Sequence, residues 1–420
     1  MAATRTSGNL SGLRILDLAG EPGFMTGMLL GELGADVVKI EPPDGDPARR
    51  RAPFWGARED PERALGWLAH NSSKRGITLD VDRPRGRELF LALCERADVV
   101  VETEPPGVME ARGLGWGVLH ARNPRLVLSS LTPFGQSGPY AGRRGADLTA
   151  VAMSGNLHCT GDPDRAPVRC TYPVSHFHGS IEAAVGVLFA LLAREHTGRG
   201  QHVDVARQEA MVMPNMATAS MALMTGNRGR RAGAFFRQAK SVQREIWPCR
   251  DGHVSFALRG GPARVPGLIA MVAFMDEHGM ASPALKAIDW KTYNHNLLSQ
   301  AEVDALSAEF GAFFRTKTMT ELFDAACARG LMLAPAYTPR EIAASKQLAA
   351  RDFFVALDDP ARGALRIPGA FARTTSADAG ASAVAVRRPA PRLGEHTAEV
   401  LSEIGVDAEE LERLRADGVA

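Results

Sequence analysis

Short apolar runs and stretches with helical spacing alternate along the first half of the chain. The run Leu13–Leu18 is followed by a turn rich in glycine and proline, a stretch with helical spacing at Met25–Leu33 and a second run at Ala35–Ile40. A strand, a turn, a helix and a strand within about 30 residues predict a βαβ unit with parallel strands and a right-handed crossover.

The same alternation continues towards residue 205. Further strands are predicted at Gly76–Leu79, Asp98–Glu102, Leu126–Leu131 and His202–Val205, and further helices at Arg83–Glu95 and Gly179–Arg194. Alternating strands and helices with apolar strands predict an open α/β sheet that is covered on both faces.

The middle of the chain has a different pattern. Residues 225–245 are rich in arginine and glycine and are predicted to form a flexible connector. Ile246–Leu258 is predicted to be a hairpin that turns at Asp251 and Gly252. Residues 262–330 are mainly helical, so a smaller second domain is expected here.

Composition narrows the class of protein. A chain of 420 residues has room for roughly two to three domains. Hydrophobic residues make up 45% and charged residues 23%, as in ordinary globular proteins. Lys plus Arg number 49 and Asp plus Glu number 48, for a net charge of +1. This balance argues against a protein that binds mainly nucleic acid or anionic membrane, so neither is expected as a partner.

Cysteine usage and the N-terminus indicate the compartment. The five cysteines are scattered and form no C-x-x-C pair, which favours neither a disulfide framework nor a zinc site. Residues 1–9 have no apolar signal core, and there is no run of about 18 uncharged apolar residues. We therefore expect a cytoplasmic enzyme or interaction protein without a metal or a membrane span.

Motifs for common cofactors and hydrolases are missing. The turn at residues 19–23 is not G-x-G-x-x-G, and the chain contains no P-loop, H-E-x-x-H or G-x-S-x-G motif. We therefore expect no nicotinamide or flavin cofactor.

Two groups of residues remain as candidates for chemistry. Lys74, Arg75, Arg144 and the run Arg49–Arg51 either bind phosphates or are solvated surface charges. His176 and His178 either act as ligands or acid–base groups or form a buried, hydrogen-bonded pair. They lie just before the predicted helix, where strand or loop spacing would put them on one face.

Several motifs together resemble the family III CoA-transferases, the group of formyl-CoA and carnitine CoA-transferases and α-methylacyl-CoA racemase. They are Lys39–Pro47, Lys74–Asp80, Ala97–Glu102, Pro106–Val108, Asn123–Leu126, Phe134–Tyr140, Thr197–Val205 and Leu393–Thr397. Their number, order and spacing make the resemblance specific, and it extends over about residues 10–415.

The resemblance implies a fold and a set of partners. It implies an α/β subunit with a Rossmann-like large domain, a smaller α+β domain and an interlocked dimer. The first part of the large domain would be residues 1–225, the small domain 226–335, and residues 336–420 would complete the large domain. The partners would be acyl-CoA, a carboxylic acid and either a second copy or a homologous subunit.

The resemblance also implies a carboxylate nucleophile. In the family, an aspartate attacks the acyl-CoA thioester and later carries CoA as an enzyme thioester. Counting back from Thr197 places that aspartate at His176. The racemase branch also has a histidine where this chain has Ala146, before Asp147. Neither proton-transfer group of a racemase is therefore expected here.

The family's CoA contacts are partly retained. Lys74 matches a CoA-contacting lysine, and Arg144 stands where a cation is common. We expect Arg75 and Gly135 to contribute to the same site. Gly260 and Gly261 fall near the family's mobile glycine loop. Pro42 replaces a frequent basic residue, and residues 102–104 depart from the usual Glu-Asn-Phe.

Four functions therefore remain open. The chain is the subunit without a nucleophile in a heteromeric CoA-transferase, or it processes acyl-CoA by itself as a hydrolase, lyase or isomerase through His176 or His178. Alternatively, it is a homomeric transferase that uses Asp147 or Glu182, or it is a non-catalytic CoA-binding protein.

Overall fold

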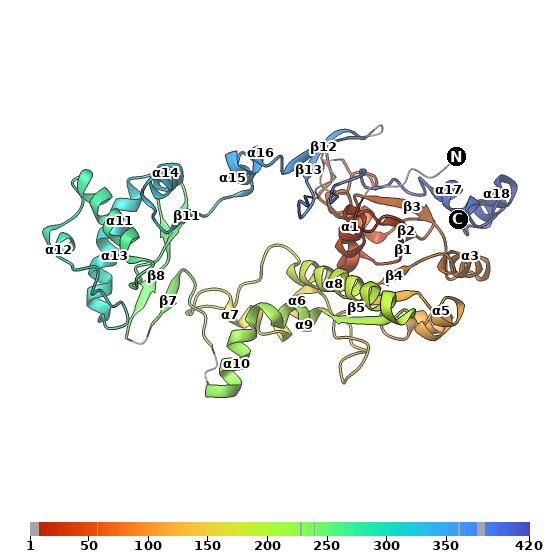
Figure 1. Cartoon of the computed structure of the whole chain (residues 1–420), viewed down its shortest axis with the longest axis horizontal. Coiled ribbons are helices and arrows are strands. Elements are labelled where there is room, and N and C mark those ends of the chain that lie inside the picture. Colours follow the sequence, from red (N-terminus) through yellow and green to blue (C-terminus); the bar gives the residue numbers. More distant parts are fainter. Residues whose placement is uncertain (1–7, 57, 227–228, 239, 360–361, 376–382) are drawn as a thin grey trace. The chain divides into compact units, whose positions relative to one another are not determined.

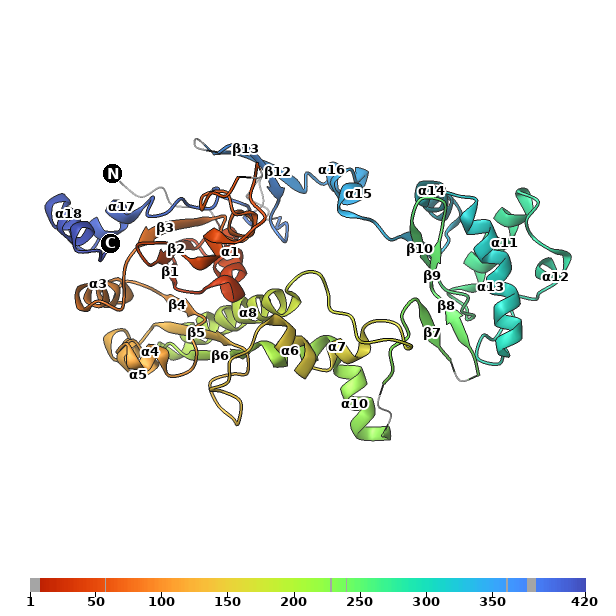
Figure 2. The ribbon, with the colours of Figure 1, turned by 180° about the vertical axis from the view of Figure 1, so that it is seen from behind.

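The computed structural model describes residues 8–56, 58–226, 229–238, 240–359, 362–375 and 383–420. The chain forms two compact units. The large unit comprises Met1–Leu157, Arg169–Asn227 and Ala349–Ala420, and the small unit comprises His158–Val168 and Arg228–Leu348. Figures 1 and 2 show the elements of each unit from two sides.

The large unit is organised around a six-stranded sheet. Its strands are β1 (Arg14–Asp17), β2 (Asp36–Glu41), β3 (Lys74–Thr78), β4 (Val99–Glu102), β5 (Val127–Thr132) and β6 (His202–Ala206). All neighbours pair in parallel, in the order β3-β2-β1-β4-β5-β6. This is the strand order of a doubly wound, Rossmann-like sheet, and it confirms the predicted α/β fold.

Helices cover both faces of this sheet because neighbouring strand residues point to opposite sides. Ile15 packs with α1 (Phe24–Glu32) and α8 (Val174–Thr197) in one core. Leu16 packs with the helices of a second core. Those helices are α3 (Pro84–Cys94), α5 (Trp116–Arg122), α17 (Thr397–Ser402) and α18 (Ala408–Ala416). Each large apolar side chain buried in these cores contributes about 1.5–3 kcal/mol.

The remaining helices of the large unit are short. They are α2 (Leu65–His70), α4 (Val108–Ala111), α6 (Asp147–Met153), α7 (Asn156–Cys159), α9 (Arg207–Val212), α10 (Met216–Thr225) and α16 (Lys346–Ala350), with α7 and α16 at the borders between units. A two-stranded ribbon of β12 (Phe354–Asp359) and β13 (Gly363–Pro368) follows in the C-terminal segment.

The C-terminal segment returns to the edge of the sheet beside β3. The backbone N–H of His396 donates to the carbonyl of Gly76 at 2.8 Å, and that of Thr78 donates to Thr397 Oγ1 at 3.0 Å. In Figures 1 and 2, α17 lies beside β3. The end of the chain is therefore part of the large unit.

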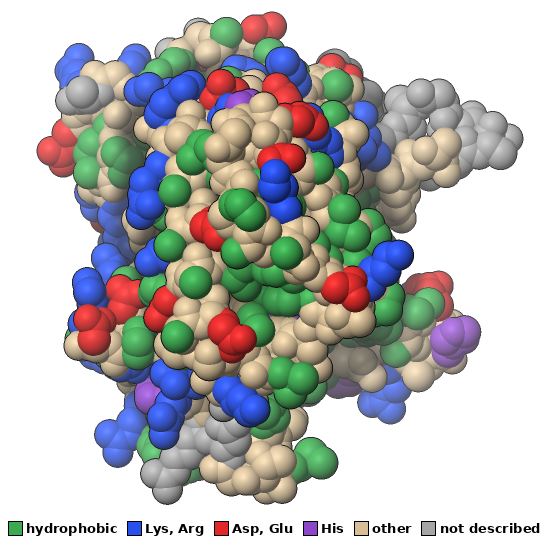
Figure 3. All heavy atoms as spheres, turned by 90° about the vertical axis from the view of Figure 1, so that its left-hand side faces the viewer, with side chains coloured by type: hydrophobic (Ala, Val, Ile, Leu, Met, Phe, Trp, Pro, Cys, Tyr) green, Lys and Arg blue, Asp and Glu red, His purple; other side chains and the backbone are tan. Residues whose placement is uncertain are grey.

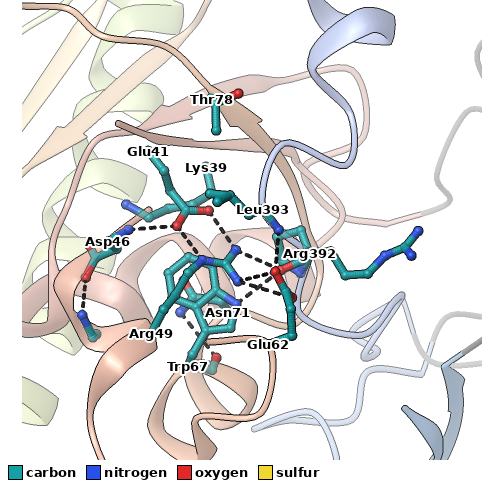
Figure 4. A network of polar contacts seen from close by, with 12 residues as sticks. Lys39, Glu41, Asp46, Arg49, Glu62, Trp67, Asn71, Thr78, Arg392 and Leu393 are labelled. Carbon is teal, nitrogen blue, oxygen red and sulfur yellow. Dashed lines mark hydrogen bonds and ion pairs between the residues drawn. The ribbon is translucent and has the colours of Figure 1, made fainter. Parts of the chain in front are cut away.

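A buried ion-pair network connects the C-terminal segment to the N-terminal part of the large unit (Figure 4). The Arg49 guanidinium pairs with Glu41, from Nε to Oε2 at 2.6 Å, and stacks 3.8 Å from the Trp67 ring centroid. It also donates to the Pro391 carbonyl at 3.0 Å. Glu62 accepts from the backbone N–H of Leu393 at 3.0 Å. Arg49 is 1% exposed, so it is neither a solvated charge nor an open phosphate contact.

The small unit has its own sheet and core. β9 (Ile246–Pro248), β10 (His253–Phe256) and β11 (Leu333–Pro335) form an antiparallel sheet, which confirms the predicted hairpin. Its helices are α11 (Val265–Glu277), α12 (Pro283–Lys286), α13 (Gln300–Arg315), α14 (Met319–Arg329) and α15 (Pro339–Ala343). The sheet packs against α11, α13 and α14 around buried aromatic side chains.

Three predictions from the pattern are corrected by the structure. Part of the expected connector at 225–245 forms a ribbon of β7 (Phe235–Arg237) and β8 (Val242–Arg244). The helical spacing of Glu395–Leu414 predicts one C-terminal helix, but the structure has two, α17 and α18, between which Gly405 adopts φ +91°. The long helix α8 begins at Val174 rather than Gly179, so His176 and His178 lie inside it.

Two observations concern membranes and nucleic acid, which are not expected as partners. Among the described residues, α8 alone is long and apolar enough to cross a membrane by length and composition, but one of its faces packs on the sheet. Figure 3 shows one face of the molecule, on which acidic and basic side chains are mixed. A mixture of both signs is typical of a surface without one dominant binding field.

Candidate functional site

A crevice lies at the carboxyl edge of the sheet, beside the ends of the paired strands β1 and β4. After β1 the chain turns at Gly20, whose N–H donates to Thr103 Oγ1 after β4 at 2.8 Å. Helix α1 then passes so close to the strand that a Cβ on Gly27 would lie 2.2 Å from Asp17 Oδ2. The strand order reverses between β1 and β4, and in open α/β sheets ligands bind at such a point.

The larger of two cavities beside Gly20 has a volume of about 560 Å³. It is lined by the turn before α1, the start of α6, the start of α8 and the start of α9. Its lining includes three ionisable side chains from these helix starts, Asp147, His176 and Arg207. Local structure places all three side chains at the cavity, because each residue lies in the first turn of its helix.

His176 lies at the wall of this cavity, half-buried, and its Nδ1 has no hydrogen-bond partner among the described residues. Burial lowers the pKa of His176 to about 4, and the nearby Arg207 adds to this effect. At neutral pH the ring is therefore uncharged. Imidazole also has no carbonyl carbon, so this side chain has no means of carrying CoA as a thioester.

His178 does not share this position. The sequence reasoning put His176 and His178 on one face, but that is wrong because both lie in α8. Two residues apart on a helix point about 200° apart. His178 is exposed and does not line the cavity.

Asp147 holds the start of α8 in place. Its Oδ1 accepts from the backbone N–H of Ser175 at 2.8 Å and from Ser175 Oγ at 2.7 Å. These bonds satisfy one of the free N–H groups at the start of the helix. Asp147 is thus a capping group as well as a cavity carboxylate.

Arg207 is the most unusual group of the cavity. It follows β6 directly and is 3% exposed, and Nη2 donates to the Gly145 carbonyl at 3.0 Å. Its Nε and Nη1 are enclosed and have no partner in the described part of the chain. Gly179 makes room for the stem, since a Cβ there would lie 2.8 Å from Arg207 Cγ. Burial lowers the pKa of this guanidinium.

The model of CoA-transferase family III matches residues 10–397. The chain belongs to CoA-transferase family III.

Two relatives extend over nearly the whole chain. The succinyl-CoA:(R)-benzylsuccinate CoA-transferase subunit BbsE of Thauera aromatica is 33% identical over 408 residues, 97% of each chain. The succinyl-CoA–L-malate CoA-transferase beta subunit of Chloroflexus aurantiacus is 31% identical over 429 residues, 100% of each chain. The crystal structure of a CAIB/BAIF family protein from Brucella suis has a TM-score of 0.79 and 28% identity, covering 95% of this chain and 100% of that chain.

CoA-transferases use acyl-CoA as a substrate, so the remaining cavity and the expected CoA contacts are compared with that substrate. The second cavity beside Gly20 has a volume of about 320 Å³. Its lining includes the carboxylates Glu41, Asp46, Asp80, Asp82 and Glu104 and the cations Lys39 and Arg112. Lys39 donates to the Ala19 carbonyl at 2.6 Å. Four of the carboxylates pair with arginines: Glu41 with Arg49, Asp80 with Arg83, and both Asp82 and Glu104 with Arg112.

Two of the residues expected to bind CoA are engaged inside the protein. Lys74 is fully buried, and its Nζ contacts Asp17 Oδ2 at 2.7 Å, the Phe24 carbonyl and Asn71 Oδ1. Arg75 is 6% exposed and pairs with carboxylates of β2 and α17. Neither lines a described cavity, and their role in CoA binding stays a prediction.

The other expected CoA contacts lie in separate places. Arg144 is exposed on the loop before α6. Gly135 follows β5 with φ +85°, and its N–H donates to Thr132 Oγ1 at 2.8 Å. Gly260 and Gly261 belong to the small unit, where the Gly260 N–H donates to His295 Nδ1 at 3.1 Å. Their roles also stay predictions.

The sequence reasoning missed Arg207 as a site residue. The available signal was its place directly after a predicted parallel strand, at the edge where ligands bind. Asp147 was considered, but its contact with Ser175 follows only from the fold. In the described part of the chain, no cluster of three or more His, Cys, Asp or Glu side chains is suited to a metal.

Proposed function

We propose that this chain is the subunit without a nucleophile in a heteromeric family III CoA-transferase. The observation that carries the proposal is His176, an uncharged imidazole at the wall of a formed cavity. The sequence resemblance predicts the family's aspartate at this position. Transfer requires a carboxylate that first takes the acyl group and then takes CoA as a thioester. In our proposal a homologous subunit supplies that carboxylate.

The names of relatives support this proposal. One is named as a subunit of a benzylsuccinate CoA-transferase and another as the beta subunit of a malate CoA-transferase. We place the pair in the cytoplasm, since five free thiols suit a reducing compartment.

The test measures CoA transfer by this chain alone and together with a homologous subunit that carries aspartate at the matching position. Succinyl-CoA is the first donor to assay, because both relatives are named for it. We expect transfer only by the pair. After donor is added, a hydroxylamine-sensitive CoA adduct should appear on the partner chain. Full transfer by this chain alone would refute the proposal.

A homomeric transferase that uses Asp147 is the second candidate, because this carboxylate lines the same cavity as His176. Glu182 is exposed on α8 and does not line the cavity. A CoA adduct on this chain that disappears in Asp147→Asn would favour this candidate.

The two remaining alternatives have less support. A base with a pKa of about 4 is weak at neutral pH, which disfavours a hydrolase, lyase or isomerase driven by His176. Turnover of acyl-CoA by the isolated chain that is lost in His176→Ala would favour it. CoA binding without turnover in any pairing would favour a non-catalytic protein.

A further inference from the structure

Three polar side chains lie side by side across β4, β5 and β6. Glu102 and Ser130 are partners in the register of β4 and β5, and His202 is the partner of Leu128 in β5. Partners in neighbouring strands share a face of the sheet, as do residues two positions apart in one strand. The three side chains are therefore on the face of Leu128, where the Trp116 ring of α5 stacks on His202 with centroids 5.8 Å apart.

Hydrogen bonds connect the three groups into a chain. Ser130 Oγ lies 2.9 Å from His202 Nε2. The Ser130 hydroxyl also donates to the Glu102 carboxylate, a contact that lowers the pKa of that carboxyl. A hydroxyl has a single proton to donate, so Ser130 accepts from one neighbour while it donates to the other. When Glu102 is ionised, His202 Nε2–H therefore donates to Ser130, and Ser130 donates to Glu102.

Glu102 is the buried end of this chain and is 2% exposed. Burial raises its pKa to about 7, against the hydrogen bonds from Ser130 and the Glu104 backbone, and repulsion from Glu104 and Glu110 adds to the rise. Arg112 faces the same turn and pairs with Glu104 at 2.9 Å. Glu102 therefore exchanges a proton close to neutral pH although its side chain is shielded from water.

His202 is the outer end of the chain. Its ring is half-buried, and its Nδ1 is not enclosed. Burial lowers the pKa of His202, while Asp204 and Glu110 oppose this effect. His120 of α5 packs against the indole that covers His202. The His202 ring is therefore mostly uncharged where Glu102 exchanges its proton, and a neutral imidazole carries its proton on either nitrogen.

We propose that His202, Ser130 and Glu102 form a proton relay that acts as a pH-sensitive switch beside the crevice. On acidification, a proton from water binds His202 Nδ1, the Nε2 proton passes to Ser130 Oγ, and the Ser130 proton passes to Glu102. His202 and Ser130 are neutral before and after, Glu102 carries the added proton, and each hydrogen bond of the chain reverses. The tautomer of His202 thereby follows the charge of Glu102.

The switch acts on the turn that follows β4. Glu102 Oε2 accepts from the backbone N–H of Glu104, and Thr103 Oγ1 accepts from the Gly20 N–H at 2.8 Å. Thr103 and Glu104 line the second cavity. A hydrogen bond to a carboxylate is stronger than one to a neutral carboxyl group. Proton uptake by Glu102 therefore weakens one of the bonds that hold this part of the cavity wall.

The test records nuclear magnetic resonance spectra of the full chain with isotope-labelled histidine across neutral pH. The His202 ring signals are assigned by their loss in His202→Gln. We expect the Nε2–H tautomer at high pH and the Nδ1–H tautomer below a midpoint near pH 7, before the ring itself becomes charged at lower pH. The backbone amide proton of Glu104 should shift with the same midpoint, because its acceptor changes charge.

A matched pair of serine variants tests the route of the proton. Ser130→Ala interrupts the chain, so the tautomer change should disappear while the Glu104 amide still reports the titration of Glu102. Ser129→Ala is the control. Ser129 is the preceding residue on the opposite face of β5, and its Oγ is enclosed without a partner among the described residues. This variant should keep the tautomer change, and Glu102→Gln should lose both signals.

The proposal is overturned if His202 keeps one tautomer across neutral pH in the wild-type chain, or if the change persists in Ser130→Ala. If Ser130→Ala does not fold, Glu102→Gln decides, because it keeps a polar group of similar shape that does not titrate. A tautomer change retained in Glu102→Gln would also overturn the relay. The test uses neither acyl-CoA nor a partner subunit, so its failure is distinct from a failure of paired CoA transfer.

Discussion

Lys74 Nζ lies 2.7 Å from Asp17 Oδ2, and both side chains are fully buried beneath the turn between β1 and α1. Burial lowers the pKa of Lys74 to about 8, and the charge of Asp17 opposes this effect. The Phe24 carbonyl and Asn71 Oδ1 complete the environment of the ammonium group. The pair therefore links β1, β3 and α1 below the crevice.

Removing one member of this pair should destabilise the large unit. Asp17→Asn and Lys74→Met should each lower the free energy of unfolding by about 3–5 kcal/mol, because each leaves an unpaired buried charge or polar group. Urea unfolding monitored by circular dichroism measures this. Arg144→Met is the control, since Arg144 is exposed and should leave stability unchanged. Stability unchanged in both Asp17→Asn and Lys74→Met would contradict the structural role.

His176 should make stability dependent on pH. Its pKa is about 4 in the folded chain against 6.5 in the unfolded chain, so between these values the unfolded chain binds more protons. Stability should therefore fall as the pH drops from 6.5 to 4, by about 2–3 kcal/mol from this group. His176→Gln should lack this component, and His178→Gln should keep it. Unfolding titrations at several pH values would show the difference.

Glu32 should change stability with pH in the opposite direction to His176. Burial raises its pKa from 4.5 to about 7, so the folded chain binds more protons between these values. Its stabilising contribution is present below pH 4.5 and is lost as the pH rises through 7. Glu32→Gln should exceed the wild type in stability at pH 8 by about 1–3 kcal/mol and match it at low pH. Glu195→Gln, an exposed change on α8, should show no such dependence.

Asp147 should contribute to stability through the start of α8. Loss of its bonds to Ser175 in Asp147→Ala should cost about 0.5–2 kcal/mol, the range for a helix cap. Ser175→Ala removes only the hydroxyl bond at 2.7 Å and should cost less. Chemical unfolding of the two variants measures both losses of stability. A larger loss in Ser175→Ala than in Asp147→Ala would contradict the prediction.

The pattern of apolar positions was sufficient to predict the sheet. Its strands are short and continuous, and they alternate with helical stretches, which leaves few arrangements for a parallel sheet. The same reasoning failed at the start of α8, because Ser175 and His176 carry no apolar signal there. The helix extends to Val174 with the help of Asp147, which lies 28 positions before its hydrogen-bond partner Ser175.

Charged residues were harder to interpret from sequence. Arg49, Arg50 and Arg51 are adjacent, yet Arg49 is 1% exposed on Trp67 while the Arg50 and Arg51 side chains are 55% and 66% exposed. Lys74 and Arg75 likewise have internal partners. The partner of a charge is set by packing between distant segments, which spacing along the chain does not reveal.

The sequence by itself determined the α/β fold, the family and the absence of an aspartate at position 176, because these depend on residue type and order. Only the tertiary structure decided that Arg207 is buried beside His176, with two guanidinium nitrogens that have no hydrogen-bond partner among the described residues, and that Asp147 is engaged with Ser175. Those relations arise where β6, α6 and α8 converge, and electrostatic energy depends on distance and burial in space.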